Sequence, residues 1–324
     1  MIPVDSLRYA MSPHGPGGSS GAAADDLFAS SSMSNVLTRR QVVGRGILAL
    51  PVLVGAFGRQ GSTASSESRL ADLEAKSGGR LGVAALNLAT GRRIAHRGDE
   101  RFPMCSTFKF LAAAFVLARV DRGEERLDRR VLFTRQDIVT YSPVTEKRVG
   151  GEGMSMGELC EAAMTVSDNT AGNLLLASFG GPAGLTAWAR ALGDPVTRLD
   201  RIEPELNDVP PGDPRDTTTP AAMTENLNRI VVGDVLSQPS RDRIIAWLVA
   251  STTGNDRLRA GLPNVWRVGD KTGTGYHGAT NDVGVAWPPD RRPLVISVYY
   301  AGSSATAAVR SAVIAEAARI VSSA

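Results

Sequence analysis

The strongest constraint on the fold is that strand-like segments stand at both ends of the globular part of the chain. Residues 81–88 and 93–95 are apolar and strand-like, and a turn at Thr90-Gly91 separates them, which is typical of a β-hairpin. The region between about 127 and 248 is mainly helical in pattern. Three more strand-like segments lie near the C-terminus, at 265–271, 282–287 and 294–300. One sheet built from both ends, flanked by helices and carrying an inserted helical lobe, is therefore expected, which is an α+β fold.

Helical patterns define the rest of the domain. The segment 66–76 is amphipathic, 108–120 is apolar almost all round, as in a buried helix, and 306–322 is rich in Ala, Ile and Val. We expect residues 66–324 to form one domain. Its α/β lobe would comprise about 66–105 and 250–324, and its all-helical lobe about 106–249.

The first 65 residues have a different character. Residues 1–35 are rich in Gly, Ser, Ala and Pro and are expected to be disordered. Arg39-Arg40 then precedes an apolar run from 46 to 57, which is the layout of a twin-arginine export signal. This run is shorter than the ~20 residues that span a membrane. We therefore expect export to the periplasm, the cell envelope or the medium, cleavage between about 58 and 66, and no stable membrane anchor. The plainer interpretation is an amphipathic leader or a short anchor helix.

Composition excludes several classes of function. The net charge of +3, without a basic stripe that carries aromatic residues, predicts no nucleic-acid partner. Two cysteines and three histidines are too few for a zinc pair or a disulfide scaffold, so no metal or other cofactor is expected. A Ser-His-Asp triad would have to use His96 or His277, and no G-x-S-x-G motif accompanies them. Glycine loops of the phosphate-binding type are also missing from the sequence.

Ser106 and Lys109 are the first candidates for catalysis. They are three residues apart where the apolar helix opens, so they share one face. A serine hydroxyl needs a base, and a lysine among apolar residues can lose its proton and act as one. The pattern alone also fits a helix cap with a solvated lysine. However, Lys109 stands between Phe108 and Phe110, which is a poor place for a solvated charge.

Two further polar motifs follow along the chain. Ser167-Asp168-Asn169 lies between a helix and a loop, where its hydroxyl could pass on a proton and its amide could bind substrate. Lys271-Thr272-Gly273-Thr274 follows a predicted strand and offers a cation and hydroxyls to a carboxylate. The N–H groups of Thr274 and Ser106 could form an oxyanion hole. Each motif alone could be an ordinary cap, turn or strand edge.

The fourth candidate motif is a loop that carries a carboxylate. Glu203, in the sequence Glu-Pro-Glu-Leu-Asn, could activate a water molecule as a general base, and Asn207 could hold that water. Arg201 and Asp216 bracket the loop with opposite charges and could clamp it as an ion pair. A solvated acidic turn is the plainer interpretation of this segment.

Taken together, these stretches resemble a class A β-lactamase. The order S-x-x-K, S-D-N, K-T-G is the signature of class A β-lactamases and penicillin-binding proteins. From about Ser66 to the C-terminus the chain is similar to chromosomal actinobacterial and mycobacterial class A members. The stretches that carry this resemblance are 104–109, 141–146, 165–173, 198–207, 212–220 and 270–275.

The resemblance implies a role for each matching residue. Ser106 would be the acylated nucleophile, assisted by Lys109, while Ser167 would protonate the β-lactam nitrogen. Glu203 and Asn207 would hold the deacylating water; whether Lys109 or Glu203 takes the serine proton stays open. The remaining positions would bind the substrate or brace the loop: Asn169 at the acylamide side chain, Lys271, Thr272 and Thr274 at the carboxylate, Tyr141 at the entrance, and Asn173 and a cis Glu203–Pro204 bond in the loop.

Departures from the family pattern carry further expectations. Where some members have a second cysteine opposite Cys160, this chain has Ala112–Ala114, and Gly275 stands where others pair a cysteine with the Cys105 position. Both thiols are therefore expected to be free, with no specialisation for carbapenems. Arg257 matches the arginine that some members use at the substrate carboxylate.

The implied function is hydrolysis of penicillins and cephalosporins through a serine acyl-enzyme, by a protein that is monomeric by family likeness. The main alternative is a D,D-peptidase or penicillin-binding protein that acylates but deacylates slowly, and Glu203 argues against it. A β-lactam sensor domain is a third possibility and would need a membrane span.

Overall fold

A five-stranded antiparallel sheet organises the domain. The computed structural model describes residues 65–324, and the predicted leader and export signal lie outside them. The strand order is β2-β1-β9-β8-β7, with every neighbouring pair antiparallel. The strands are β1 (Arg80–Asn87), β2 (Arg93–His96), β7 (Arg267–Thr274), β8 (Thr280–Trp287) and β9 (Leu294–Ala301). The predicted sheet from both ends of the chain is confirmed, and β9 lies at its centre.

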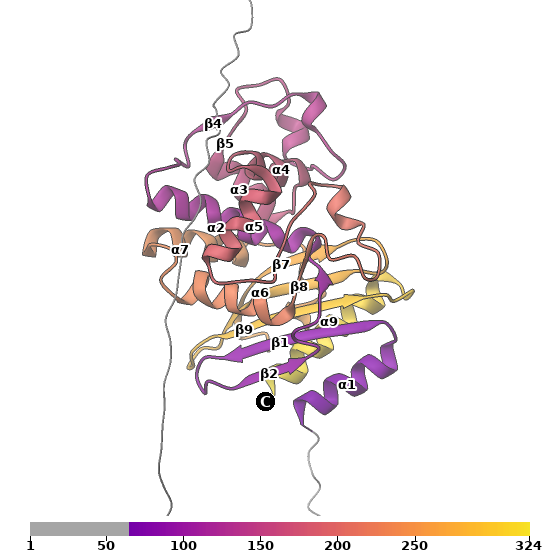
Figure 1. Cartoon of the computed structure of the whole chain (residues 1–324). Coiled ribbons are helices and arrows are strands. Elements are labelled where there is room, and N and C mark those ends of the chain that lie inside the picture. The colour runs from indigo at the N-terminus through magenta and orange to yellow at the C-terminus, as the bar shows by residue number, and fades with distance from the viewer. Residues whose placement is uncertain (1–64) are drawn as a thin grey trace, which may run out of the picture. The chain divides into compact units, whose positions relative to one another are not determined.

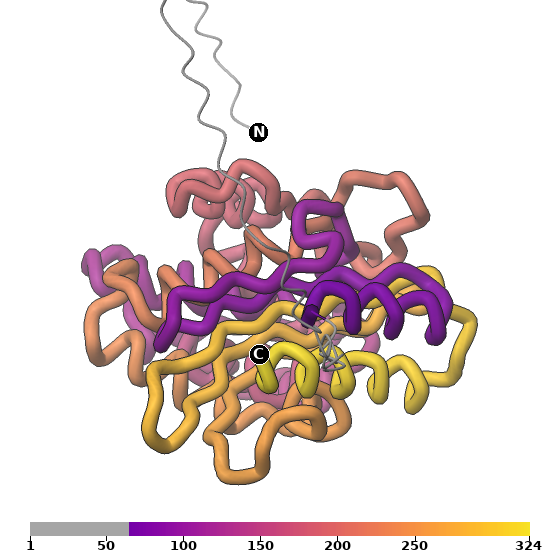
Figure 2. The backbone as a smooth tube through the Cα atoms, turned by 90° about the horizontal axis from the view of Figure 1, so that it is seen from below, coloured from indigo at the N-terminus to yellow at the C-terminus, as the bar shows by residue number. Residues whose placement is uncertain are grey.

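Alternation along β9 gives the sheet two apolar faces. Ile296 and Val298 pack with α1 (Ser66–Ser77), α8 (Leu258–Gly261) and α9 (Ala307–Ser322) in one core cluster. Figure 1 shows α1 and α9 together on one side of the sheet, and Figure 2 shows them side by side from below. The two ends of the domain meet there, because Arg69 donates a hydrogen bond to the hydroxyl of Ser323 at 3.1 Å.

The other face of the sheet carries the helical lobe (Figure 1). Val295 and Tyr299 of β9 belong to this second core cluster, together with most of the buried helix α2. As predicted, α2 (Phe108–Asp121) is apolar and buried along most of its length. Around it lie α3 (Met156–Thr165), α4 (Asn169–Ala177), α5 (Gly181–Ala191) and α7 (Gln238–Val249), while α6 (Pro220–Leu227) packs directly on β1 and β9.

One predicted boundary is wrong, and it concerns the site. The K-T-G stretch was expected to follow a strand, but it lies inside β7, which continues to Thr274. Gly273 pairs with Asn281 of β8, and the Asn281 amide donates to the carbonyl of Pro103 at 2.8 Å. A Cβ on Gly273 would lie 2.7 Å from the carbonyl oxygen of Met104, so only glycine lets the strand run this close to the turn before α2.

Within the described residues, no helix is both long enough and apolar enough to cross a membrane. Cys105 and Cys160 are both buried and form no disulfide, as expected from the departures from the family pattern.

Candidate active site

Ser106 lies in a single 3₁₀ turn, Cys105–Thr107, that leads into α2. The sequence placed it at the helix start, whereas α2 itself begins at Phe108. Cys105 adopts a positive φ of 46°, and this sharp turn brings the serine side chain over the first turn of the helix. Ser106 is 9% exposed, so most of the residue is shielded from solvent.

Lys109 is fully buried beneath Ser106. Its ammonium group donates to Ser106 Oγ at 2.9 Å, to the Ser167 carbonyl at 2.9 Å and to Asn169 Oδ1 at 2.6 Å. It also lies 3.0 Å from Glu203 Oε1, with both side chains completely shielded from solvent. Burial lowers the pKa of Lys109 from its usual range, and the Glu203 charge opposes that shift.

Glu203 completes a chain of hydrogen bonds with the serine. Ser106 Oγ donates to Glu203 Oε1 at 3.2 Å, and the Asn207 amide donates to Oε2 at 2.5 Å. Asn173 braces the backbone, because its Oδ1 accepts from the Glu203 N–H at 2.9 Å and its amide donates to the Glu203 carbonyl at 2.9 Å. The Glu203–Pro204 bond is cis, as the resemblance implied.

An ion pair closes the base of this loop. Arg201 Nε lies 2.6 Å from Asp216 Oδ2, and the Asp216 side chain is fully buried. Asp216 Oδ1 also accepts the backbone N–H groups of Asp200 at 2.8 Å and Arg201 at 2.9 Å. The opposite charges that bracket the loop in the sequence are thus joined in the structure.

Lys271 and Ser167 form a second hydrogen-bonded pair of the site. Lys271 Nζ donates to Ser167 Oγ at 2.9 Å and to the Thr272 carbonyl at 2.8 Å. Burial, with a further contribution from the Lys109 charge, lowers the pKa of Lys271 to about 7. Lys271 can therefore change its charge near neutral pH.

Asp168 has a structural role that the sequence did not reveal. It is fully buried and caps α4 by accepting the Ala171 N–H at 2.9 Å. It also accepts the Thr145 hydroxyl at 2.9 Å and the Val144 N–H at 2.9 Å. These partners lie more than 20 residues earlier in the chain, so no local motif signals them. They fix the loop that presents Ser167 and Asn169.

An open cavity of about 410 Å³ exposes Ser106, Ser167, Asn169 and Asn207, whereas Lys109, Glu203 and Lys271 are fully buried and do not line it. Arg257 lies in its wall and donates to Thr274 Oγ1 at 2.7 Å and to the carbonyls of Gly273 at 3.0 Å and Asn281 at 2.7 Å. Thr253 lines the cavity too and was not among the residues predicted from sequence. The full lining is Ser106, Tyr141, Ser167, Asn169, Asn207, Thr253, Arg257, Thr272 and Thr274.

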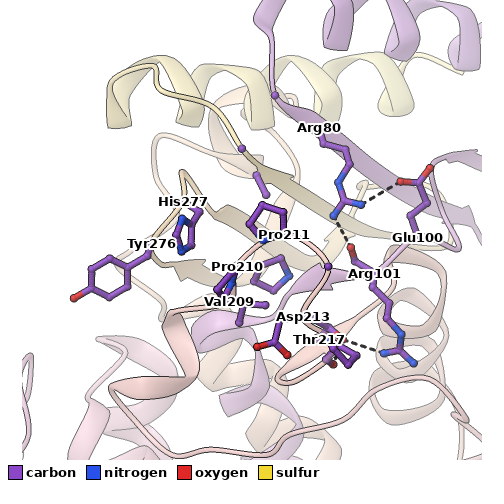
Figure 3. A pocket seen from close by; sticks show the side chains of 16 residues that line it. Arg80, Glu100, Arg101, Val209, Pro210, Pro211, Asp213, Thr217, Tyr276 and His277 are labelled. Atoms are coloured by element: carbon purple, nitrogen blue, oxygen red, sulfur yellow. Dashed lines mark hydrogen bonds and ion pairs between the residues drawn. The ribbon is translucent and has the colours of Figure 1, made fainter.

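A larger hollow of about 600 Å³ lies elsewhere, between the segment 209–214, the turn at Tyr276-His277, the beginning of β1 and the end of β9 (Figure 3). Its walls are mainly apolar, and neither Ser106 nor Glu203 lines it. The smaller cavity is lined by Ser106 and Ser167, and the buried groups Lys109, Glu203 and Lys271 are hydrogen-bonded to these two serines. Among residues 65–324, no cluster of three or more His, Cys, Asp or Glu side chains is arranged to hold a metal ion.

Known proteins of one family are similar to this chain in sequence and in fold. The profile of the Beta-lactamase enzyme family matches residues 65–324. The β-lactamase AST-1 of Nocardia asteroides is 49% identical over 295 residues, covering 91% of this chain and 94% of the relative. The β-lactamase of Streptomyces albus G is 48% identical over 266 residues, covering 81% and 85%.

Among solved structures, an ancestral class A β-lactamase is 64% identical, with a TM-score of 0.79 over 80% of this chain and 99% of that one. A profile match over most of the chain and relatives of this identity establish the family. The chain therefore belongs to the class A serine β-lactamases and is a β-lactam hydrolase.

Proposed function

We propose that the protein hydrolyses penicillins and cephalosporins through an acyl-enzyme on Ser106, which a water activated by Glu203 then hydrolyses. The observation that carries this proposal is the buried chain of hydrogen bonds from Lys109 through Ser106 to Glu203. A chain of this kind joins a nucleophile to a base within the reach that proton transfer requires.

In the acylation step, Glu203 receives the serine proton. An ammonium group has only donors and a carboxylate only acceptors, so Lys109 donates to Ser106 and Ser106 donates to Glu203. The Ser106 oxygen attacks the β-lactam carbonyl as its proton leaves toward Glu203. The backbone N–H groups of Ser106 and Thr274 stabilise the oxyanion.

Ser167 donates its proton to the ring nitrogen as the amide bond breaks, and a proton from Lys271, hydrogen-bonded to that hydroxyl, replaces it. The proton that Glu203 took from Ser106 leaves to solvent before deacylation, and Lys271 regains a proton from solvent. The substrate carboxylate is bound at the cavity wall formed by Thr272, Thr274 and Arg257, and Arg257 together with the buried Lys271 next to Thr272 compensates its charge. Asn169 uses one amide proton for the Thr140 carbonyl, which leaves a second for the acylamide carbonyl. Tyr141, 59% exposed, flanks the entrance.

Deacylation distinguishes this function from that of a penicillin-binding protein. Glu203 and Asn207 form a carboxylate–amide pair beside the serine, where a water can be both deprotonated and oriented. Asn173 holds the Glu203 backbone and Asn207 holds its Oε2, so the carboxylate is positioned before substrate binds.

The decisive experiment counts chromogenic cephalosporin molecules hydrolysed per protein and then repeats the count with Glu203→Gln. We expect many turnovers for the parent protein and a roughly 10²–10⁴-fold slower deacylation in the variant, with the acyl adduct on Ser106 visible by mass spectrometry. Glu205→Gln is the matched control, since Glu205 is an exposed carboxylate of the same loop. A burst of one equivalent followed by a stall in the parent protein would favour the peptidase alternative.

We also propose that the protein is exported by the twin-arginine route and acts as a monomer. Arg39-Arg40 before the apolar run 46–57 supports the route, and replacing both arginines by lysine should abolish export. The monomer is proposed from likeness to the family, and light scattering can test it.

A further inference from the structure

Thr253 makes one of the shortest contacts in the cavity wall. It lies in the loop between α7 and α8, and its hydroxyl oxygen is 2.6 Å from that of Thr272. This is a short O–H···O hydrogen bond, in which either oxygen can be the donor. Because each hydroxyl has a single proton, the donor in this pair decides what Thr272 offers to the cavity.

A buried carboxylate lies at the other end of the same row. Ser251 Oγ donates to Asp270 Oδ2 at 3.3 Å and lies 3.4 Å from Thr253 Oγ1. Asp270 is fully buried, and its other oxygen accepts from Arg259 at 2.5 Å. Because Ser251 donates its only hydroxyl proton to Asp270, it can only accept a hydrogen bond from Thr253.

The row therefore has two proton arrangements. In the first, Thr272 donates to Thr253, Thr253 donates to Ser251, and Thr272 turns only lone pairs toward the cavity. In the second, Thr253 donates to Thr272, and the Thr272 proton points into the cavity. The second gives up only the 3.4 Å contact between Thr253 and Ser251, which is the weakest link of the row.

We propose that Thr253 is a positioning residue that turns the Thr272 hydroxyl into a donor toward the substrate carboxylate. The inference rests on the proposed function, in which Lys271 and Thr272 bind that carboxylate. An anion accepts protons and repels lone pairs, so its arrival selects the second arrangement. A substrate whose carboxylate is masked as an ester carries no such charge and exerts a much weaker preference.

Arg257 acts on Thr274 in the same sense. Arginine has no acceptor, so Thr274 Oγ1 must accept from Arg257 at 2.7 Å, and the Thr274 proton is free to face the cavity. Thr272 and Thr274 alternate with Gly273 along β7, so both side chains lie on the same face of the strand. The hydroxyls of Thr272 and Thr274, each accepting a hydrogen bond from a neighbouring side chain, can then both donate to the substrate carboxylate.

The test compares Thr253→Val with Thr253→Ser. Valine keeps the shape and removes the hydroxyl, whereas serine keeps the hydroxyl. Steady-state kinetics are measured for a penicillin with a free carboxylate and for its methyl ester. For the acid, we expect Thr253→Val to raise KM by up to about ten-fold with little change in kcat, because it removes the hydrogen bond that orients the Thr272 hydroxyl. The ester should be hardly affected, and Thr253→Ser should restore the parent KM.

Lys271→Gln distinguishes failure of the Thr253 role from failure of the proposed carboxylate site. A preference for acid over ester that falls in Lys271→Gln but is unchanged in Thr253→Val would overturn the role of Thr253 alone. A preference unchanged in both variants would overturn the carboxylate site and the Thr253 role with it. Equal loss of acid and ester hydrolysis in Thr253→Val, without rescue by serine, would mean that Thr253 only packs the loop, and thermal unfolding of both variants would show it.

Discussion

Lys271 illustrates how single residues acquire function from burial. It is fully buried in β7, and the charges of Lys109, Asp270, Asp282 and Arg257 act on it. Burial dominates and brings the pKa of Lys271 to about 7. Nothing in the tripeptide K-T-G reveals this value, because it depends on partners supplied by other elements.

A pH dependence follows from this lowered pKa. Below about pH 7 the unliganded protein holds Lys271 as a cation, and above it the cation is progressively lost. We therefore expect kcat/KM for an anionic penicillin to fall on the alkaline side, since kcat/KM reports groups of the free enzyme. Lys271→Arg, which stays charged, should move that fall to higher pH. A profile from pH 5 to 10 that is identical in both proteins would contradict this assignment.

Arg257 offers a second prediction at this scale. Arg257→Ala removes the donor that holds Thr274 and a cation of the cavity wall. We expect KM for penicillins to rise roughly ten-fold, as for the loss of a hydrogen bond to a charged group. Arg257→Lys, which keeps the charge but loses the several N–H donors of the planar guanidinium, should recover only part of the affinity. Unchanged KM across several penicillins would count against the role.

The sequence anticipated most of the residues in the cavity, because their motifs are local and their chemistry is specific. It missed Thr253 and left Asp168 without a role, and both act through contacts with distant segments. Ordinary threonines and aspartates in turns give no signal of such contacts.

At the scale of elements, the loop from Arg201 to Asp216 is the part whose integrity matters most for deacylation. Its clamp is a buried carboxylate with one guanidinium partner. We expect Arg201→Ala to destabilise the closed loop by roughly 3 kcal/mol, because it leaves a buried charge unpaired. Hydrogen exchange of the loop amides should accelerate, and deacylation should slow.

Arg215→Ala is the matched control for this loop. Arg215 pairs with Asp213 in the same segment at 2.7 Å, but its side chain is 51% exposed. An exposed pair of this kind contributes little, so exchange and deacylation should remain near the parent values. Equal changes in hydrogen exchange and deacylation in Arg201→Ala and Arg215→Ala would contradict the specific role of the Arg201–Asp216 ion pair.

Elements also mark the limit of sequence-based inference. Alternating apolar residues indicated where the strands lie, but not that β7 extends through the K-T-G stretch. That extension depends on β8 reaching back to Thr280 and on the close approach of Gly273 to Met104. Both are contacts between segments far apart in the chain, whereas periodicity reports only on one segment.

At the scale of the whole molecule, one sheet is shared by two cores. β9 contributes Ile296 to one core cluster and Val295 to the other. We expect Ile296→Ala, in the sheet, and Leu111→Ala, in α2, each to lower the free energy of unfolding by about 2–5 kcal/mol. Because the shared sheet couples the cores, each variant should unfold in a single transition. Urea titrations followed by circular dichroism and by tryptophan fluorescence test this, and midpoints that differ between the two probes would contradict it.

The contact between Arg69 and Ser323 has a consequence for how the chain could be rewired. Since the beginning and the end of the domain touch on α1 and α9, a short peptide could join them without crossing the sheet. The chain could then be opened in an exposed turn, such as 288–293 between β8 and β9, to give a circular permutant. Every strand pair and every catalytic side chain would keep its neighbours, so the order in which the segments are synthesised could be separated from the architecture that they build.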